Sequence, residues 1–175
     1  MATSKNYVFL TVGGALGLAA AFLQTIEKII LIENKTAALP CDLTDVFSCS
    51  AVLSAPQSSL FGFPNSLICM VVFTFFLTIG VIGLTGGEIP NKLRRFTHGL
   101  ALFMLAFALW FLFTSTFTIG ALCIFCFICF AGLLFINNAT LRLAPYRFKF
   151  ESYSPLVWAT LALALLAAIL VRFYL

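Results

Sequence analysis

Residues 96–141 contain no Lys, Arg, Asp or Glu, and this long uncharged run constrains the fold more than any other feature of the sequence. At about 1.5 Å per residue, one helix of this length would reach about 70 Å, more than twice the roughly 30 Å hydrocarbon core of a bilayer. Two spanning helices joined by a tight hairpin fit better, and the polar run 114–116 marks the turn. We therefore expect spanning helices over 96–113 and 117–136.

The other apolar stretches predict three more spanning helices, over 7–26, 66–84 and 155–174, each close to the roughly 20 residues that a bilayer requires. The chain is 62% hydrophobic and only 9% charged, whereas an ordinary soluble domain is about 25% charged. A soluble fold of this size could not hide so much apolar surface. The sequence therefore predicts an all-α membrane protein in which residues 1–175 form a single membrane domain.

The positions of Lys and Arg predict the orientation, because cytoplasmic loops carry an excess of positive charge. With the N-terminus in the cytoplasm, the cytoplasmic side receives Lys5, Lys92, Arg94, Arg95, Arg142, Arg147 and Lys149, and the outer side receives only Lys28, Lys35 and Arg172. These basic residues flank apolar segments, so the net charge of +4 indicates membrane orientation rather than binding to nucleic acid. The loop 27–65 and the hairpin that precedes 117–136 then both lie outside.

The outer loop 27–65 contains two cysteines, Cys41 and Cys49. Eight helical residues rise about 12 Å, which is too far for a disulfide, since its Cα atoms are about 4.4–6.8 Å apart. If the two cysteines bond, the segment between them is not one straight helix. If they do not, Asp42 could cap a helix. A purely structural loop disulfide is the alternative to a redox-active one.

A second pair, Cys123 and Cys126, forms a C-x-x-C sequence just after the expected hairpin, on the same side of the membrane. Three helical residues leave two side chains one turn apart, which permits a disulfide. The alternatives are simple packing of small side chains and a zinc site built from four thiolates, which an oxidising outer face disfavours. Two pairs on one face favour thiol–disulfide chemistry. We expect Cys69 and Cys129 to be core residues, and the expected spans contain no buried charge that would indicate an ion path.

Three short motifs together resemble the vitamin K epoxide reductase family. They are C-D-x6-C-S (Cys41, Asp42, Cys49, Ser50), F-G-F-P-N (residues 61–65) and C-I-F-C (residues 123–126). The resemblance covers about residues 7–136, and F-G-F-P-N and the fifth helix are more similar to bacterial members, which make disulfides for secreted proteins. It implies a four-helix transmembrane bundle around a quinone, with the outer loop capping the bundle and a fifth helix added.

The resemblance also implies roles for individual residues. Cys126 would lie beside the quinone, and Cys123 would be its partner and would accept attack from Cys49. Cys41 and Cys49 would receive electrons from a thioredoxin-like protein. Two further residues would assist, Asn65 by a hydrogen bond to a quinone oxygen and Asp42 by setting the reactivity of the loop. The cofactor would be menaquinone or ubiquinone, and the location would be the cytoplasmic (inner) membrane with the active site on its extracytoplasmic side.

Two departures from the family pattern bear on function. Phe130 stands where vertebrate members usually carry a tyrosine, and it cannot donate a hydrogen bond, which disfavours epoxide reduction. Many bacterial members carry a fused thioredoxin domain that this sequence lacks, so we expect a separate redox partner. The leading hypothesis is thus a quinone-dependent thiol oxidoreductase. The alternatives are a vitamin K epoxide or quinone reductase and a non-enzymatic membrane subunit with incidental cysteines.

Overall fold

A computed structural model describes residues 2–44, 46–145 and 154–174, and this part of the chain is helical, with one isolated β-bridge and no β-strand. Its elements follow the sequence in a simple order. They are α1 (Ala2–Glu33), α2 (Cys49–Ser54), the short 3-10 helix η1 (Pro56–Ser59), α3 (Asn65–Leu84), α4 (Asn91–Thr114), the π-helical turn η2 (Ser115–Ile119), α5 (Ile124–Leu143) and α6 (Ser154–Tyr174).

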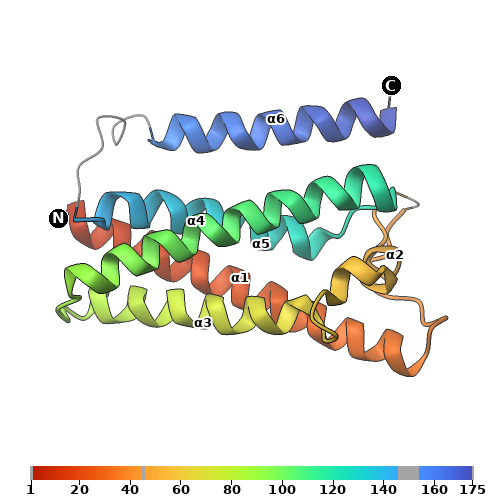
Figure 1. Ribbon diagram of the computed structural model, residues 1–175, viewed down its shortest axis with the longest axis horizontal. Coiled ribbons are helices and arrows are strands. Elements are labelled where there is room, and N and C mark those ends of the chain that lie inside the picture. The colour runs from red at the N-terminus through yellow and green to blue at the C-terminus, as the bar shows by residue number, and fades with distance from the viewer. Residues whose placement is uncertain (1, 45, 146–153, 175) are drawn as a thin grey trace.

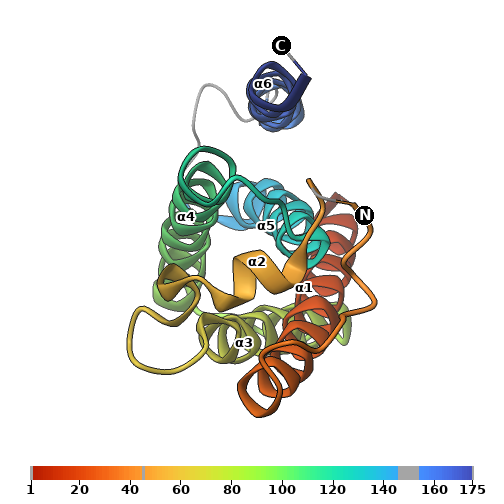
Figure 2. The ribbon, with the colours of Figure 1, turned by 90° about the vertical axis from the view of Figure 1, so that its right-hand side faces the viewer.

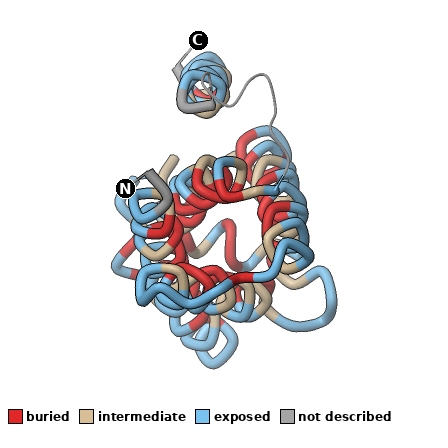
Figure 3. The backbone as a smooth tube through the Cα atoms, turned by 90° about the vertical axis from the view of Figure 1, so that its left-hand side faces the viewer, coloured by how far each residue is buried: buried red, intermediate tan, exposed pale blue. Residues whose placement is uncertain are grey.

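Five helices in the described residues are long and apolar enough to cross a membrane, namely α1, α3, α4 (continued by η2), α5 and α6. Four of them, α1, α3, α4 and α5, run alongside one another as a bundle, and α2 lies across one end of it (Figures 1 and 2). Buried residues face the interior of the bundle and exposed residues face outward (Figure 3). The predicted class, an all-α membrane protein with a capped four-helix bundle and a fifth helix, is confirmed.

Helix α1 packs closely against α5 because glycines meet at the crossing. A Cβ atom added to Gly13 would lie 2.7 Å from the carbonyl oxygen of Gly132, and one added to Gly132 would lie 2.8 Å from that of Gly13. Within a membrane the apolar surfaces of helices gain little from leaving lipid, so close van der Waals packing between small residues contributes much of the association. Larger side chains fill the rest of the interior, including Leu10, Phe73, Phe76, Leu112 and Ile136.

Helix α6 stands beside the bundle rather than within it (Figure 1). Trp158, Leu161 and Leu165 pack against the bundle core, whereas Leu163 is 64% exposed and Leu170 is 56% exposed. An exposed apolar helix of this length suits a lipid environment.

The ends of several helices differ from the expected bounds. Helix α1 begins at Ala2 rather than at residue 7, α4 begins at Asn91 rather than at residue 96, and α5 ends at Leu143 rather than at residue 136. Helix α1 continues to Glu33 instead of ending at residue 26, so the outer loop is correspondingly shorter. Two of its charged residues beyond position 26 have partners in the capping segment, Glu27 at Cys41 and Lys28 at Leu53 and Ser58. The fourth span begins at Ile124 rather than at residue 117.

The later start of α5 has a local cause. Residues 115–119 do not reverse the direction of the chain. They continue α4 as one turn of π-helix, and the carbonyl of Ser115 accepts hydrogen bonds from the N–H groups of Gly120 (2.9 Å) and Ala121 (3.2 Å). Gly120 then ends the helix with a φ of 77°, which favours glycine. The chain runs extended through Cys123, whose φ is −110° and ψ is 124°. Cys123 is therefore the N-cap of α5 rather than part of the helix.

Candidate active site

Cys41 and Cys49 form a disulfide with a Cα–Cα distance of 5.7 Å. Of the two possibilities left open by the sequence, the bonded one is observed, and the described residues between the two cysteines are not helical. Helix α2 begins only at Cys49, where Ser48 is the N-cap and its side chain accepts a hydrogen bond from the N–H of Ala51. The disulfide therefore joins the loop to the first residue of the helix that covers the bundle.

Asp42 holds this small loop together. Its carboxylate accepts hydrogen bonds from the N–H of Ser50 (2.9 Å), the hydroxyl of Ser48 (3.1 Å) and the N–H of Leu39 (3.3 Å). Partial burial opposes ionisation, but these hydrogen bonds outweigh it and hold the pKa of Asp42 below its usual value. Asp42 thus supplies a capping contact to α2 and ties together the chain on both sides of the disulfide.

We expect Asp42→Asn to loosen α2 at neutral pH but not in acid. The native pKa lies below the unfolded value of about 3.9, so the stabilising contribution is full at neutral pH and is lost as pH falls through the native pKa. After allowance for solvent screening the loss is about 1 kcal/mol, which corresponds to roughly fivefold faster amide exchange.

Hydrogen exchange of residues 49–54 by mass spectrometry checks this prediction, with the exposed Glu88→Gln as the control at the far end of the bundle. The same increase at neutral and at strongly acidic pH would contradict an ionised Asp42.

The outer loop is joined to the segment that precedes α5. The N–H of Leu122 donates a 2.7 Å hydrogen bond to the carbonyl of Val46, and Phe47 and Leu122 form a parallel β-bridge. The ring of Phe47 also lies 6.4 Å, between centroids, from that of Phe127 in α5. This pairing brings two stretches that are distant in sequence to the same end of the bundle.

As a result, the two cysteine pairs share one buried cluster. Cys49 and Cys123 are both fully buried, and Cys41 is 6% exposed. The other members of the cluster are apolar. They are Leu31, Leu39, Val52, Leu53, Phe111 and Ala121, with Ile119, Phe125 and Cys126 packed against them.

Cys123 and Cys126 are free thiols in this structure. Cys123 precedes the first turn of α5, and its carbonyl accepts a hydrogen bond from the N–H of Cys126 (3.1 Å). The hydrogen bond from the Cys126 thiol lowers the pKa of Cys123 and outweighs the opposing effect of burial. Position at a helix N-terminus favours a thiolate as well.

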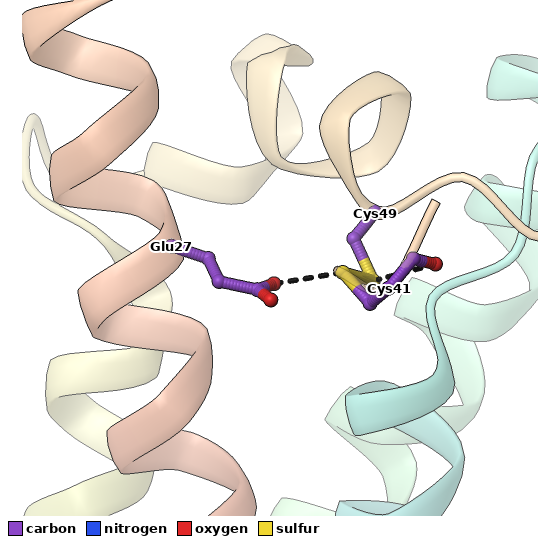
Figure 4. Close-up of side chains that lie close together, drawn as sticks. All are labelled: Glu27, Cys41 and Cys49. Carbon is purple, nitrogen blue, oxygen red and sulfur yellow. Dashed lines mark hydrogen bonds between the residues drawn. A yellow bond between two sulfur atoms is a disulfide. The ribbon is translucent and has the colours of Figure 1, made fainter. Parts of the chain in front are cut away.

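Helix α1 contributes two polar side chains that the sequence did not single out. The amide of Gln24 donates to the sulfur of Cys126 (3.4 Å) and lies 4.0 Å from that of Cys123. The carboxyl group of Glu27 lies 2.8 Å from the sulfur of Cys41 (Figure 4). Gln24 therefore contacts the inner cysteine pair and Glu27 the outer pair.

Lys28 is a third residue of this face. Its ammonium group donates to the hydroxyl of Ser58 (3.0 Å) and to the carbonyl of Leu53, and so fastens the capping segment to α1. Residues at positions i, i+3 and i+4 share one side of a helix, and polar residues at 24, 27 and 28 in an apolar segment are the signal that could have identified this face.

A cavity lies beneath α2, between the helices of the bundle, and Cys126 forms part of its wall. Its volume, counted as the space open to the centre of a water molecule, is about 60 Å³. Polar groups of Gln24, Lys28, Ser58, Asn65 and Ser66 are on its wall. The remaining lining is mostly apolar and consists of Leu53, Pro64, Cys69, Phe73, Met104, Phe107, Ala108, Phe111, Leu112, Cys129 and Leu133.

These walls fit a quinone, because an apolar ring system needs apolar surroundings and a few polar groups for its oxygens. Asn65, the first residue of α3, lies at the cavity as the resemblance implied, but its side chain is also engaged elsewhere. Its amide donates to the carbonyl of Gln57 (2.8 Å), and its oxygen accepts from the N–H of Leu60 (3.1 Å). One amide hydrogen remains for a ligand.

Other cysteines and Phe130 have simpler surroundings. Cys69 and Cys129 contribute to the cavity wall and the core, and the thiol of Cys129 lies 3.7 Å from the carbonyl of Gly17. Phe130 is buried in the bundle core and is not among the cavity-lining residues.

Among the described residues, Glu27, Cys41 and Cys49 have ligand atoms close enough to share a metal ion, but the two sulfurs are joined in a disulfide and offer no thiolate.

The comparison with known proteins agrees with this geometry. No individual curated protein matches the chain. The model of the vitamin K epoxide reductase family matches residues 8–136, which include both cysteine pairs, all of α3 and α4 and most of α1 and α5. The chain therefore belongs to the vitamin K epoxide reductase family, whose members are membrane thiol oxidoreductases that work with quinones.

Proposed function

We propose that this protein is a quinone-dependent thiol oxidoreductase that oxidises a separate thioredoxin-like partner and so drives disulfide formation in secreted proteins. The observation that carries the proposal is the continuity of the sulfur sites. The Cys41–Cys49 disulfide shares a buried cluster with Cys123, and Cys126, the neighbour of Cys123, lines the cavity that fits a quinone.

The relay begins at the outer disulfide. A thiolate of the partner attacks Cys41, which is slightly exposed, and Cys49, which is fully buried, leaves as a thiolate. Cys49 then attacks Cys123 of an inner Cys123–Cys126 disulfide, and Cys126 leaves as a thiolate at the cavity wall. The lowered pKa of Cys123 makes it a good leaving thiol in the exchange that restores the outer disulfide.

The residues around the cavity hold and orient the cofactor. A bound quinone, menaquinone or ubiquinone, supplies a lipid-soluble acceptor for two electrons. The amide of Gln24 keeps the sulfur of Cys126 in place, and Asn65 offers its remaining hydrogen to a quinone oxygen. The apolar walls exclude water from the reacting sulfur.

The aqueous donor and the lipid-soluble acceptor explain the membrane location. We place the protein in the cytoplasmic membrane with its N-terminus inside, so that the end of the bundle covered by α2 faces the extracytoplasmic side. The excess of Lys and Arg at the opposite side supports this orientation.

A disulfide between Cys49 and Cys123 tests the order of the relay. In Cys41→Ser/Cys126→Ser the two relay cysteines that remain are Cys49 and Cys123, and we expect mild oxidation to link them in most molecules, because both are fully buried in one cluster. Mass mapping of peptides from the full-length protein detects the link.

The matched control is Cys49→Ser/Cys126→Ser, which leaves Cys41 and Cys123. It should form little crosslink, because the sulfur of Cys41 lies against Glu27 of α1. A higher yield in the control, or no Cys49–Cys123 link, would show that electrons do not pass through Cys49.

A further inference from the structure

Glu27 is a buried carboxyl group in direct contact with a reactive sulfur. Its side chain is 7% exposed, and its oxygen lies 2.8 Å from the sulfur of Cys41 (Figure 4). A sulfur atom in a disulfide carries no hydrogen, so the hydrogen in this contact belongs to Glu27. When Cys41 is reduced, the same geometry lets its thiol donate to the carboxylate.

The surroundings of Glu27 leave it without a cationic partner among the described residues. Lys28 is next along α1, but its ammonium group is directed to Leu53 and Ser58. The other titratable or charged groups that face Glu27 are Asp42 in the outer loop, Cys123 before α5 and the two bonded cysteines. A buried carboxyl group in such a place is most stable when it carries its proton.

We propose that Glu27 is the general acid and base of the outer disulfide, and that it moves a proton to and from the sulfur of Cys41. This role rests on the proposed function, because it assigns a proton donor to two of its exchange steps. Proton transfer by a side chain needs hydrogen-bond contact with the reacting atom, and Glu27 already has that contact.

The first of these steps releases the oxidised partner. After the first attack the partner is bound to Cys41 through a mixed disulfide, and Cys49 is a thiolate. The second thiolate of the partner attacks the partner sulfur of this bond. A disulfide forms within the partner, the bond to Cys41 breaks, and Cys41 leaves with the electron pair. Glu27 gives its proton to Cys41, which becomes a thiol while Glu27 becomes a carboxylate.

The second step restores the outer disulfide. Once Cys49 is bonded to Cys123, the carboxylate of Glu27 removes the proton from Cys41. Cys41 attacks Cys49, the Cys49–Cys123 bond breaks, and Cys123 leaves as a thiolate. The outer disulfide, which the structure shows, is formed again, and Glu27 regains its proton.

Glu27→Gln tests the role, because glutamine keeps the shape and a hydrogen-bond donor but cannot transfer a proton. We use full-length protein in lipid nanodiscs, reduced thioredoxin as the thiol probe and a short-chain ubiquinone as the acceptor. Turnover should fall about 100-fold. The mixed disulfide between Cys41 and thioredoxin should accumulate, as seen by mass spectrometry after acid quenching and alkylation. The matched control is Glu33→Gln, an exposed glutamate on the same helix, which should match the unaltered protein.

The pH dependence separates proton transfer from a structural role. Above the pH at which Glu27 loses its proton, the unaltered protein also lacks a proton donor. The rate at which the unaltered protein releases oxidised thioredoxin, divided by the same rate for Glu27→Gln, should therefore fall as pH rises. The proposal would be overturned if Glu27→Gln turned over as fast as the unaltered protein. It would also be overturned if Glu27→Gln were slower but no mixed disulfide accumulated, or if the ratio of the two release rates did not change with pH.

A single-turnover measurement keeps this test apart from the test of the proposed function. Fully reduced protein is mixed with ubiquinone, and the step at Cys126 should proceed equally in the unaltered protein and in Glu27→Gln. If the unaltered protein does not reduce ubiquinone, the proposed function fails. If it does, and Glu27→Gln turns over normally with thioredoxin, only the role of Glu27 fails.

Discussion

Replacing Cys126 with alanine is expected to abolish quinone reduction by a dithiol substrate. Cys126 is the cysteine of the two pairs that lines the cavity, so its loss would remove the sulfur through which electrons leave the protein in the proposed relay. Loss of a reacting nucleophile lowers turnover by about 10³-fold or more. The measurement is the absorbance change of ubiquinone with reduced thioredoxin as donor. The partner should still open the Cys41–Cys49 disulfide once, since that step does not involve Cys126.

The matched control is Cys69→Ala, which removes another cysteine sulfur from the same cavity wall. Cys69 has no part in the proposed relay, so turnover should stay within about tenfold of that of the unaltered protein, and any loss should come from altered packing. Unchanged turnover in Cys126→Ala would remove the proposed mechanism.

Gly13→Ala is expected to destabilise the bundle markedly. The added methyl group would lie 2.7 Å from the carbonyl oxygen of Gly132 and 3.0 Å from a side-chain carbon of Ile136. The first neighbour is backbone and cannot rotate away, so α1 and α5 must move apart. Overpacking of this kind costs about 1–3 kcal/mol. The midpoint of thermal unfolding in detergent should fall by several degrees.

Gly99→Ala provides the opposite result with the same chemical change. Nothing lies within 4 Å of a Cβ atom at Gly99 in α4, and alanine is favoured over glycine in a helix interior by about 0.5–1 kcal/mol. Its unfolding midpoint should be equal or higher. A similar fall in both variants would mean that the α1–α5 contact does not limit stability.

Much of the fold could be predicted because hydrophobic length is a strong signal. The uncharged run 96–141 is too long for one span, and α4 and α5 are the two helices that result. The same signal placed the outer loop and the segment before α5 at one end, and the structure joins them through Val46 and Leu122. Hydrophobicity reports which residues avoid water, and a membrane protein is organised mainly by that property.

The face of α1 that borders the site could not be recognised in this way. The charged residue at position 27 predicts the end of the helix, because charge marks the edge of the hydrocarbon. The helix continues because its polar groups find partners, Gln24 on Cys126, Glu27 on Cys41 and Lys28 on Ser58. Those partners come from other segments, so they cannot be predicted from the sequence of α1 alone.

The start of α5 was missed for a different reason. The C-x-x-C pattern suits a helix, but Gly120 breaks the chain direction and leaves Cys123 extended at the N-cap. Whether the polar run 114–116 reverses the chain or continues the helix depends on the hydrogen bonds that the carbonyl of Ser115 accepts from Gly120 and Ala121. Hydrogen bonds of this kind are decided by the folded surroundings.

The short loop closed by Cys41 and Cys49 has a kinetic consequence. Asp42 binds the start of α2, and the Val46–Leu122 hydrogen bond fastens the loop to the bundle, neither through sulfur. Both ends of the loop therefore stay in place after reduction, and in the proposed relay the Cys41 thiol meets the Cys49–Cys123 disulfide at a high effective concentration. We infer that the Cys41–Cys49 disulfide forms again faster than a new thiol diffuses into the site. Small thiols such as glutathione should therefore seldom react with the cysteines of the outer loop.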